Sequence, residues 1–508
     1  MTALSTARPE SWATIVPSGA DSRMNEGELG AGEPPRTGSG RPVRPWPAAT
    51  VGLLAVFLGG LNISLVVIAL PTIRSVFDLS SSGQQWLVSG YFLTLGLTLV
   101  PAGRFGDQRG RRNIFVAGIM LSVVASVVAG FAPSGKWLII ARLTQGVGVG
   151  IALPQVFGAV QRLFSPRDRG RPLGLLAVGV SGSRLAGPIL GGALVTLGGE
   201  QGWRWIFLIN VPLGIVVAGF GWRLFPVAER GRRPDLDLIG ALLLMGGLGL
   251  LWLMQGEQWP GLLRWLLLPA GLAMLAAFFY WERSYARRGE PIFNLGLFRI
   301  RSFALGAFIA TFYFAGYEAI YYLVSEYLQQ GLGHDELVAA IALMPLAVGT
   351  ALGSVAAGAR ASRIGRPLIA AGLACGAVGL AMLLVADLFL PDPRSPHAAT
   401  LPLLLAGLGG GLVTAGVGGG LVIAPNQTLA LAHVPPAQGG SAGGMLQTGQ
   451  RLGGGFGVAV VGTALFTSLD RTGDWLLAFR IPMAVIICFF VIAFVAVLID
   501  LVTRSRSR

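Results

Sequence analysis

The sequence contains little charge. Only 12% of its 508 residues are Asp, Glu, Lys or Arg, whereas a soluble domain carries about 25%. Lysine is nearly absent, because Lys136 is the only lysine among 38 basic residues. A chain with so little charge cannot cover a water-facing surface, which excludes a soluble enzyme. A single-span anchored domain is also excluded, since no long polar stretch follows residue 47.

The residue types that carry catalysis or hold metals are scarce as well. The three histidines, His334, His397 and His433, lie far apart in the chain. The two cysteines, Cys375 and Cys488, lie in apolar runs with no metal or disulfide spacing, and we expect them to be small buried side chains. No phosphate-binding Gly-Lys-Ser/Thr loop is present, so the chain lacks the ATP-binding motif that ATP-driven transport needs. We therefore expect no cofactor, no metal and no enzymatic reaction.

Apolar segments fill the chain after residue 47. Many are about 20 residues long, which is the length that crosses a bilayer, and they predict an all-α integral membrane protein. Residues 1–47 are rich in Pro, Gly, Ser and Arg, and we expect them to form a disordered tail. The fourteen predicted spans are 48–70, 84–104, 113–132, 136–161, 172–197, 205–225, 236–256, 261–281, 303–328, 337–359, 367–390, 401–424, 445–467 and 480–502.

The distribution of arginine predicts the orientation. An even number of spans places both termini on one side, and 28 of the 38 basic residues lie on that side. Seven lie on the other side, and three, Arg142, Arg184 and Arg451, lie inside spans. Cytoplasmic loops of membrane proteins carry an excess of Lys and Arg. Both termini are therefore expected in the cytoplasm of a cell whose inner membrane holds the protein. The net charge of +14 reflects this topology, so we expect no nucleic-acid partner.

An internal duplication is visible in two short turns. The segments 103–112 and 358–366 each combine glycine with a cluster of arginines after an apolar span. If they correspond, the chain consists of two six-helix bundles with an inserted helix pair and a short basic tail. The predicted boundaries are 48–225, 236–281, 303–502 and 503–508. Two repeated bundles around a central cavity are typical of secondary transporters.

The first turn carries a recognisable motif. Gly103-x-x-x-Asp107-x-x-Gly110-Arg111 resembles the signature of the major facilitator superfamily between its second and third helices. A tight turn between helices needs glycine, and an acid there can cap a helix or pair with arginine. The resemblance implies that this charge cluster latches one conformation. A solvated basic loop would explain the arginines, but not Asp107 at this spacing.

Two further segments resemble motifs of the same family. Arg142 and Gln145, on one face of the fourth span, resemble the motif whose arginine is linked to proton transfer. Snorkelling of Arg142 to the outer interface is the alternative. In the fifth span, five residues resemble the motif that marks exporters. They are Gly182, Gly187, Pro188, Gly191 and Gly192. Arg184 stands where the family usually has a small residue, and an anionic partner or an anionic substrate group would explain it.

Later segments resemble the fourteen-span drug:proton antiporters, the multidrug efflux branch associated with antibiotic resistance. They are 203–214, 237–240, 345–349, 425–427 and 440–453, so the resemblance covers about residues 50 to 500. One departure concerns coupling. The branch typically has an aspartate in the first span, where this chain has Asn62. An amide cannot exchange a proton, so we expect Asn62 to bind substrate by hydrogen bonds.

The proton-exchanging group is then expected to be Glu318, assisted by Arg142. Glu318 is the acid nearest mid-depth of a span, whereas Glu326 and Asp387 are expected to reach water near span ends. Burial of a carboxyl group favours its protonated form. Replacement of the acid is therefore expected to stop proton-driven transport.

Aromatic side chains surround this acid in the sequence. Tyr313, Tyr317 and Tyr321 share its span, and an acid among aromatic faces suits a lipophilic cation. An aromatic belt at the membrane interface is the alternative, which accounts for Tyr322 and Tyr327 but less well for the others. With Asn62, Gln145 and Asn426, the first three tyrosines form the expected substrate cavity.

These patterns predict a monomeric exporter that exchanges protons for small hydrophobic compounds, cationic ones included. A lipid or metabolite exporter with weak or no proton coupling is the alternative, which Asn62 favours. A membrane sensor that transports nothing would not need Arg142, Arg184 and Glu318 inside spans.

Overall fold

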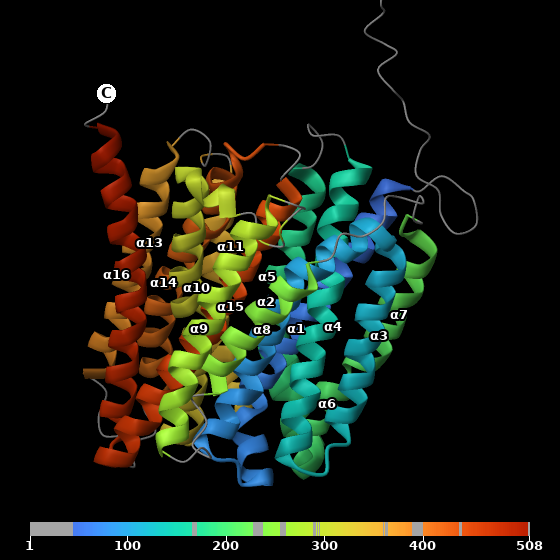
Figure 1. Cartoon of the computed structure of the whole chain (residues 1–508). Helices are drawn as coiled ribbons and strands as arrows, with labels where there is room; N and C mark the ends of the chain where they lie inside the picture. The colour runs from blue at the N-terminus through green and yellow to red at the C-terminus, as the bar shows by residue number, and fades with distance from the viewer. Residues whose placement is uncertain are drawn as a thin grey trace, which may run out of the picture.

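The computed structural model describes residues 44–164, 170–226, 237–253, 261–287, 291, 293, 295–358, 360, 364–388, 400–435 and 439–505. Every regular element in these ranges is helical (Figure 1). The long helices are α1 (Pro45–Phe77), α2 (Ser81–Arg109), α3 (Arg111–Gly130), α4 (Gly135–Leu163), α5 (Gly170–Gly198), α7 (Asn210–Leu224), α8 (Leu238–Leu253), α9 (Gly261–Tyr285), α10 (Arg301–Glu326), α11 (Glu336–Gly358), α13 (Arg366–Leu388), α14 (Thr400–Leu431), α15 (Gly439–Thr472) and α16 (Trp475–Ser505). The short elements are η1 (Gly199–Gln201), α6 (Gly202–Leu208), η2 (Leu295–Arg299) and η3 (Tyr327–Gly331).

Each of the fourteen predicted spans coincides with a helix, if α6 and α7 are taken as one span. In the described residues, twelve of these helices are long and apolar enough to cross a membrane by themselves. The other two predicted spans lie on α8, a shorter apolar helix, and on α14. The all-α membrane fold is therefore confirmed, and the helices are compatible with fourteen spans. Residues 1–43 of the expected tail and 506–508 lie outside the described residues.

The outer surface of the bundle is apolar. On α16, for example, Val491, Val495 and Ile499 are exposed. In water such a surface would drive aggregation, but in lipid it lies in a solvent as apolar as itself. Cys488 is exposed on the same helix and Cys375 is half-buried, so the expectation that both cysteines are buried is wrong. The reason is that an apolar residue gains nothing from burial when the surrounding solvent is also apolar.

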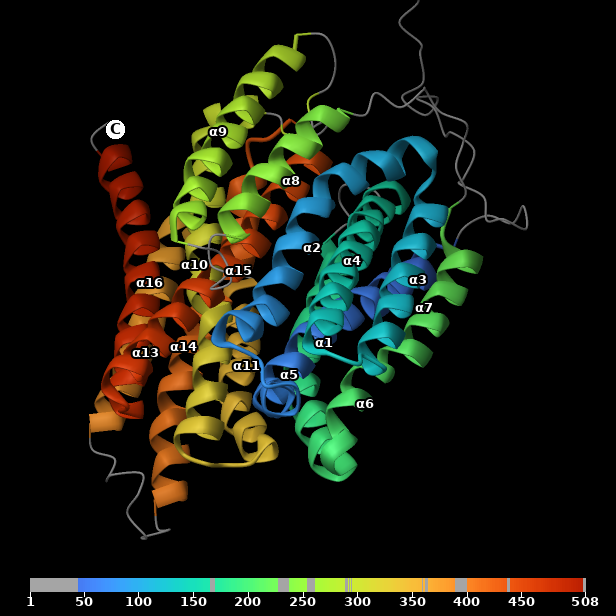
Figure 2. The same ribbon diagram turned by 60° about the horizontal axis from the view of Figure 1, so that its bottom comes forward.

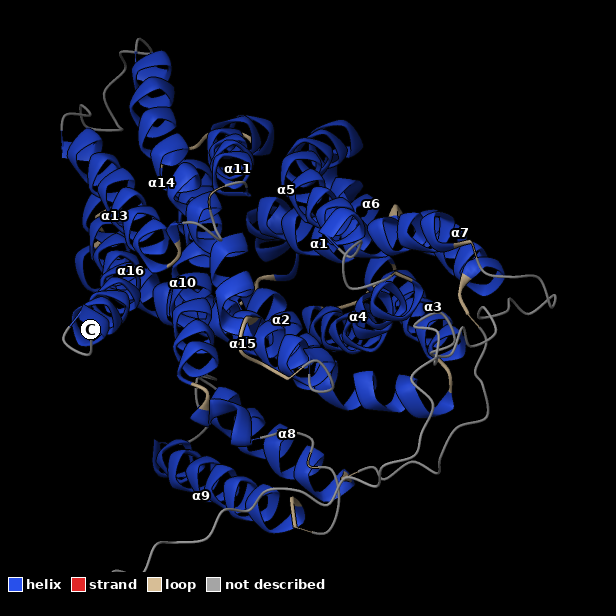
Figure 3. Ribbon diagram, turned by 90° about the horizontal axis from the view of Figure 1, so that it is seen from above, coloured by secondary structure: helices blue, strands red, loops and turns tan. Residues whose placement is uncertain are grey.

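Apart from α8 and α9, the helices form two groups, which we take as the two halves of the molecule (Figure 3). In the N-terminal half, α1 packs on α5, and α2 and α3 pack on α4. In the C-terminal half, α10 packs on α15 and α16, and α14 packs on α11 and α13. The halves meet along two seams, where α2 contacts α15 and where α5 contacts α11.

Helices α8 and α9 form a hairpin beside the α2–α15 seam (Figure 2). Leu93 and Leu97 of α2 pack in one apolar cluster with Leu244 of α8 and Phe278 of α9. Asp237, directly before α8, accepts hydrogen bonds from the backbone N–H of Gly240 (2.8 Å) and the indole N–H of Trp281 on α9 (2.7 Å). This one carboxylate caps α8 and ties it to α9.

The two ends of the bundle can be told apart by where the first helix begins and the last helix ends. Helix α1 begins and α16 ends at the end drawn uppermost in Figure 1, which we call the terminal end. The other end, where α1 ends and α2 begins, we call the far end. Helix α10 runs from the terminal end to the far end, so residues along it can be ordered by depth at about 1.5 Å each.

Glycine allows the closest helix contacts of the C-terminal half. A Cβ atom on Gly453 or Gly457 of α15 would collide with the backbone carbonyl oxygen of Thr311 or Ala315 on α10. Small residues let membrane helices approach backbone to backbone, where dispersion contacts replace the missing hydrophobic drive. The abundance of glycine, 75 residues in all, is therefore a packing requirement at such contacts.

We expect the substitution Gly457→Ala to destabilise the protein by about 1–3 kcal/mol, since the added methyl group meets backbone that cannot move aside. Thermal unfolding of the purified protein in detergent would show a lowered midpoint. Gly443→Ala on the same helix is the matched control, because a Cβ there meets open space. Equal midpoints for the two variants would contradict this account of the contact.

Candidate functional site

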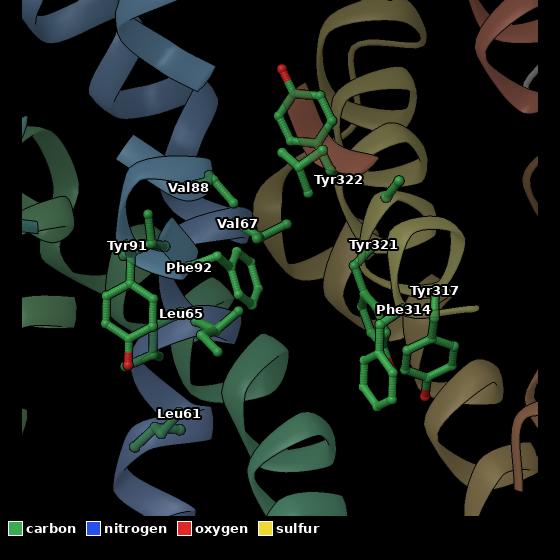
Figure 4. Close-up of a cluster of buried hydrophobic side chains, with 14 of the residues drawn as sticks. Leu61, Leu65, Val67, Val88, Tyr91, Phe92, Phe314, Tyr317, Tyr321 and Tyr322 are labelled. Atoms are coloured by element: carbon green, nitrogen blue, oxygen red, sulfur yellow. The ribbon is translucent and has the colours of Figure 1, made fainter. Parts of the chain in front are cut away.

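A small pocket lies between the two halves. Twelve residues from six helices line it: Ile63, Ser64, Val67, Ile68, Val88, Phe92, Arg184, Pro188, Glu318, Tyr321, Leu343 and Val458. Figure 4 shows buried hydrophobic side chains on both sides of it, with Val67, Val88 and Phe92 of the pocket lining on α1 and α2 and Tyr321 on α10 opposite them. The cavity measures about 10 Å³, which is room for about one water molecule. A larger ligand can therefore enter only if the halves separate.

An ion pair joins the two halves across this pocket. Arg184 of α5 donates from its Nη2 to Oε1 of Glu318 on α10 (2.5 Å) and from its Nη1 to Oε2 (3.4 Å). The side chains are only 12% and 4% exposed. Two parallel charge-assisted hydrogen bonds of this kind are strong and directional. The carboxylate that the sequence assigned to a cationic ligand is thus neutralised by a cation of the protein itself.

Aromatic rings hold the arginine of this pair. The guanidinium of Arg184 lies 4.7 Å from the ring centre of Tyr317 and 5.5 Å from that of Tyr321. The Tyr317 ring stacks on that of Tyr313 at 5.4 Å, and its hydroxyl is hydrogen-bonded to Thr350 of α11 (2.8 Å). Of the three tyrosines expected in the cavity, Tyr321 lines the pocket. Tyr317 and Tyr313 are not part of the lining and pack behind it.

The tyrosines nearer the far end do not form an interfacial belt. Tyr322 and Tyr327 are buried, with 0% and 1% of their surfaces exposed. The ring of Tyr327 stacks on Phe479 of α16 at 4.2 Å. Their hydrophobic rings are therefore part of the protein core rather than membrane anchors.

Arg142 lies in a second polar cluster, within the N-terminal half. It is 1% exposed, which excludes snorkelling to the interface. Its Nε donates to the carbonyl oxygen of Leu87 on α2 (3.0 Å), and its Nη1 donates to the carbonyl of Asn62 on α1 (3.3 Å) and to Oε1 of Gln145 (2.9 Å). The guanidinium also lies 4.3 Å from the ring centre of Tyr91. Arg142 thus joins α1, α2 and α4.

Two expected cavity residues belong to this cluster rather than to the pocket lining. Gln145 donates to the hydroxyl of Ser126 on α3 (2.7 Å). The amide of Asn62 donates to the Leu58 carbonyl of its own helix (3.1 Å), and its Oδ1 is buried without a partner. The next two residues of α1, Ile63 and Ser64, do line the pocket.

Asn426, a further expected cavity residue, lies near the terminal end of the C-terminal half. Its amide donates to the Gly306 carbonyl on α10 (2.8 Å), and its Oδ1 accepts from Arg366 (3.4 Å). Gly306 precedes Glu318 by twelve residues, which is about 18 Å along the helix. Arg366 also pairs with Asp500 (3.7 Å), so this cluster connects α10, α13, α14 and α16.

The expected latch lies at the terminal end of the N-terminal half. Helix α2 ends before Gly110, whose φ of 98° is a conformation that favours glycine, and α3 begins at the next residue. Gly103 faces Pro154 of α4, and the guanidinium of Arg111 occupies the space over Gly158 on the same helix. The side chain of Asp107 lies outside the described residues.

The five motif residues of α5 lie along its contacts with both halves. Gly182, Gly187 and Gly191 face Phe57, Ser64 and Leu65 of α1 respectively. Gly192 faces the backbone of Leu337 on α11, in the opposite half. Pro188 lines the pocket within an unbroken helix.

A third polar cluster closes the far end, and the sequence did not predict it. Glu326 of α10 is fully buried, and its Oε1 accepts from the amide of Gln84 on α2 (2.5 Å). The expectation that Glu326 reaches water is therefore wrong, because η3 continues α10 beyond it and α2 covers it. Ser325 and Gln329 donate to the carbonyls of Val67 and Ile68 on α1. The far end is thus joined by hydrogen bonds between the halves.

Two helical halves with a buried ion pair and a pocket between them are an arrangement typical of secondary transporters. Comparison with known proteins identifies the family. The model of the Major Facilitator Superfamily matches residues 52–458. The chain therefore belongs to the major facilitator superfamily, and it is a transporter rather than an enzyme.

Several curated relatives are similar over most of their length. The chain is 33% identical over 443 residues to a probable actinorhodin transporter of Streptomyces coelicolor, with 85% of this chain and 75% of the relative covered. It is 32% identical over 427 residues to a puromycin resistance protein of Streptomyces alboniger, covering 83% and 82%. It is 31% identical over 447 residues to a tetracenomycin C resistance and export protein of Streptomyces glaucescens, covering 86% and 78%.

Solved structures share the fold. A D-xylose-proton symporter superposes with a TM-score of 0.60 at 15% identity, covering 89% of this chain and 97% of that chain. A bacterial homologue of the human lysosomal transporter Spinster, in an inward-facing conformation, gives 0.61 at 17% identity with the same coverage. At such identities the likeness concerns the fold alone.

We expect Gln84→Leu to destabilise the protein by about 1–3 kcal/mol, because it leaves the buried Glu326 without its donor. The double variant Gln84→Leu with Glu326→Leu is expected to recover much of this loss, since an apolar pair needs no donor. Thermal unfolding in detergent measures both. A double variant no more stable than Gln84→Leu would argue against the hydrogen bond.

Proposed function

We propose that this protein is a plasma-membrane exporter of small hydrophobic compounds, antibiotics among them, and that it exchanges them for protons. The names of the relatives, which concern export of or resistance to antibiotics, support the substrate class. The excess of arginine at the terminal end supports a cytoplasmic location for both termini. We further propose that the protein works as a monomer.

The observation that carries proton exchange is the ion pair between Arg184 and Glu318. A proton that binds Glu318 removes its negative charge, and with it the charge-assisted bonds that join α5 to α10. Loss of the proton restores them. Protonation of one residue thus changes the attraction between the two halves, which is what an exchanger of alternating access requires.

The hydrogen bonds that join the halves at the far end are a second contact that must break during this cycle. Because the pocket holds about one water molecule, substrate release towards the far end requires that the bonds of Glu326, Ser325 and Gln329 open. In our proposal, protonation of Glu318 returns the emptied protein to the conformation that loads at the terminal end.

Three of the sequence motifs have supporting roles in this proposal. Gly103, Gly110 and Arg111 shape the latch at the terminal end, together with Asp107. The glycines of α5 let this helix slide between α1 and α11 during the exchange of conformations. Arg142 makes no contact with Glu318, so we assign it an indirect part: it positions α2, whose residues Val88 and Phe92 line the pocket.

Export with weak or no proton coupling is the second candidate. It is favoured by Asn62, which cannot exchange a proton, and by the fact that Glu318 already has a partner in Arg184. The two candidates differ in one measurable quantity, the dependence of transport on an imposed pH gradient.

We expect Glu318→Gln to abolish proton-driven transport while the protein still inserts into the membrane. Glutamine keeps the shape and a hydrogen-bonding oxygen but cannot gain or lose a proton. A panel of ethidium, puromycin and tetracenomycin C, tested by growth in a drug-sensitive host, identifies a transported compound. Its uptake into inside-out vesicles is then measured with and without an acid interior.

Asp335→Asn provides the control. Asp335 is exposed at the far end, and its Oδ1 accepts from the Val338 N–H at the start of α11, which asparagine can also do. This variant should transport like the wild type. If pH-driven uptake persists in Glu318→Gln, proton exchange at Glu318 is refuted; if wild-type uptake ignores the pH gradient, the uncoupled exporter is the correct candidate.

A further inference from the structure

Three arginines lie within predicted spans. Of these three, Arg451 on α15 has no hydrogen-bonding or ion-pair partner in the described structure. Arg142 donates to carbonyl and amide oxygens, and Arg184 is bonded to Glu318. Arg451 makes no hydrogen bond and no ion pair in the described structure, and its Nε is buried without an acceptor. A guanidinium in a membrane span is costly unless it is paired, and such residues mark substrate pathways.

Arg451 lies on the face of α15 that leads to the pocket. Residues 451, 454 and 458 share one face of the helix, and Val458 lines the pocket. A Cβ on Gly454 would lie 2.8 Å from Cγ of Glu318. Arg451 is therefore about one helical turn from the level of Glu318, towards the terminal end.

Helix α2 packs against this face of α15. A Cβ on Gly96 would lie 3.4 Å from Cβ of Arg451, and Phe92, one turn further along α2, lines the pocket. Arg451 thus lies on the α2–α15 seam between the halves, on the terminal-end side of the pocket.

The charges around the pocket sum to a positive value. The charged groups near Arg451 are Glu318 and Arg184. Glu318 supplies one negative charge, which its bonds to Arg184 already neutralise. The positive charge of Arg451 remains uncompensated. A cationic ligand would be repelled at such a site, and an anionic ligand would bring its net charge to zero.

We propose that Arg451 binds the acidic group of the exported compound, and that the preferred substrates are hydrophobic organic anions with a carboxylate or phenolate group. The planar guanidinium suits a carboxylate, with which it forms two parallel hydrogen bonds. The aromatic side chains of Phe92 and Tyr321 offer faces for the hydrophobic part of the molecule.

This inference rests on the proposed export function and names its substrate class. It also gives the transport direction a physical reason. A cell interior is electrically negative, so the membrane potential favours the exit of an anion. In the orientation we propose, the substrate meets Arg451 before it reaches the ion pair.

Binding of three matched probes tests the proposal. 1-Pyrenebutyrate, its amide and 1-pyrenebutylamine share one hydrophobic ring system and differ in charge. Their affinities are measured at constant pH with the full-length protein in nanodiscs of zwitterionic lipid, with empty nanodiscs subtracted. We expect the carboxylate to bind at least about tenfold more tightly than the amide, as one charge-assisted hydrogen bond implies, and the amine to bind most weakly.

Variants of Arg451 identify the residue responsible. Arg451→Gln should bind the carboxylate no better than the amide while its affinity for the amide stays within about twofold, and Arg451→Lys should keep part of the preference. Arg471→Gln is the matched control, since Arg471 is exposed in the last turn of the same helix and should keep the full preference.

The results that overturn the proposal are equally specific. They are a wild type that binds none of the three probes, one that binds the amide or amine as tightly as the carboxylate, and an Arg451→Gln variant that keeps the preference. Loss of carboxylate binding when phosphatidylglycerol is added would assign Arg451 to a lipid headgroup instead. No pH gradient is imposed in these binding measurements. A negative result would therefore refute anion binding by Arg451 without bearing on proton exchange at Glu318.

Discussion

The cost of placing charge inside a membrane is the constraint on which the rest of this structure depends. It explains why the few charged side chains within spans have such specific surroundings. Arg184 and Glu318 satisfy each other across the two halves at 2.5 Å, and Arg142 is bonded to oxygens of three helices. Where water cannot solvate a charge, the protein or a bound ligand must supply its partner. The position of a buried charge is therefore informative about function in a way that a surface charge is not.

The same constraint makes the ion pair suited to an exchange of conformations. Its two members belong to different halves, and one of them can lose its charge by binding a proton. An ion pair of this kind is strong when the carboxylate is charged and weaker when it is protonated. The glycine contacts of α5 with α1 and α11 provide the complementary property, since close backbone packing without large side chains allows helices to shift.

Much of the fold could be predicted from the sequence. All fourteen predicted spans coincide with helices, because a stretch of about 20 apolar residues has few alternatives in lipid. The motifs likewise predicted the superfamily, which the match over residues 52–458 confirms. Individual burial was harder to predict. Glu326 was expected to reach water since it lies near the end of a span, yet it is buried by α2, which is more than 200 residues away in the chain.

The candidate site shows the same division. The sequence alone determined that Glu318, Arg142, Arg184 and Arg451 lie within spans, because hydropathy and charge are properties of each segment. Only the tertiary structure decided which of them meet. It paired Glu318 with Arg184 rather than Arg142, placed Asn426 in a cluster with Arg366, and left Arg451 without a partner. The physical reason is that hydrogen bonds and ion pairs act over a few ångströms between helices, and the distances between helices depend on the packing of the whole bundle.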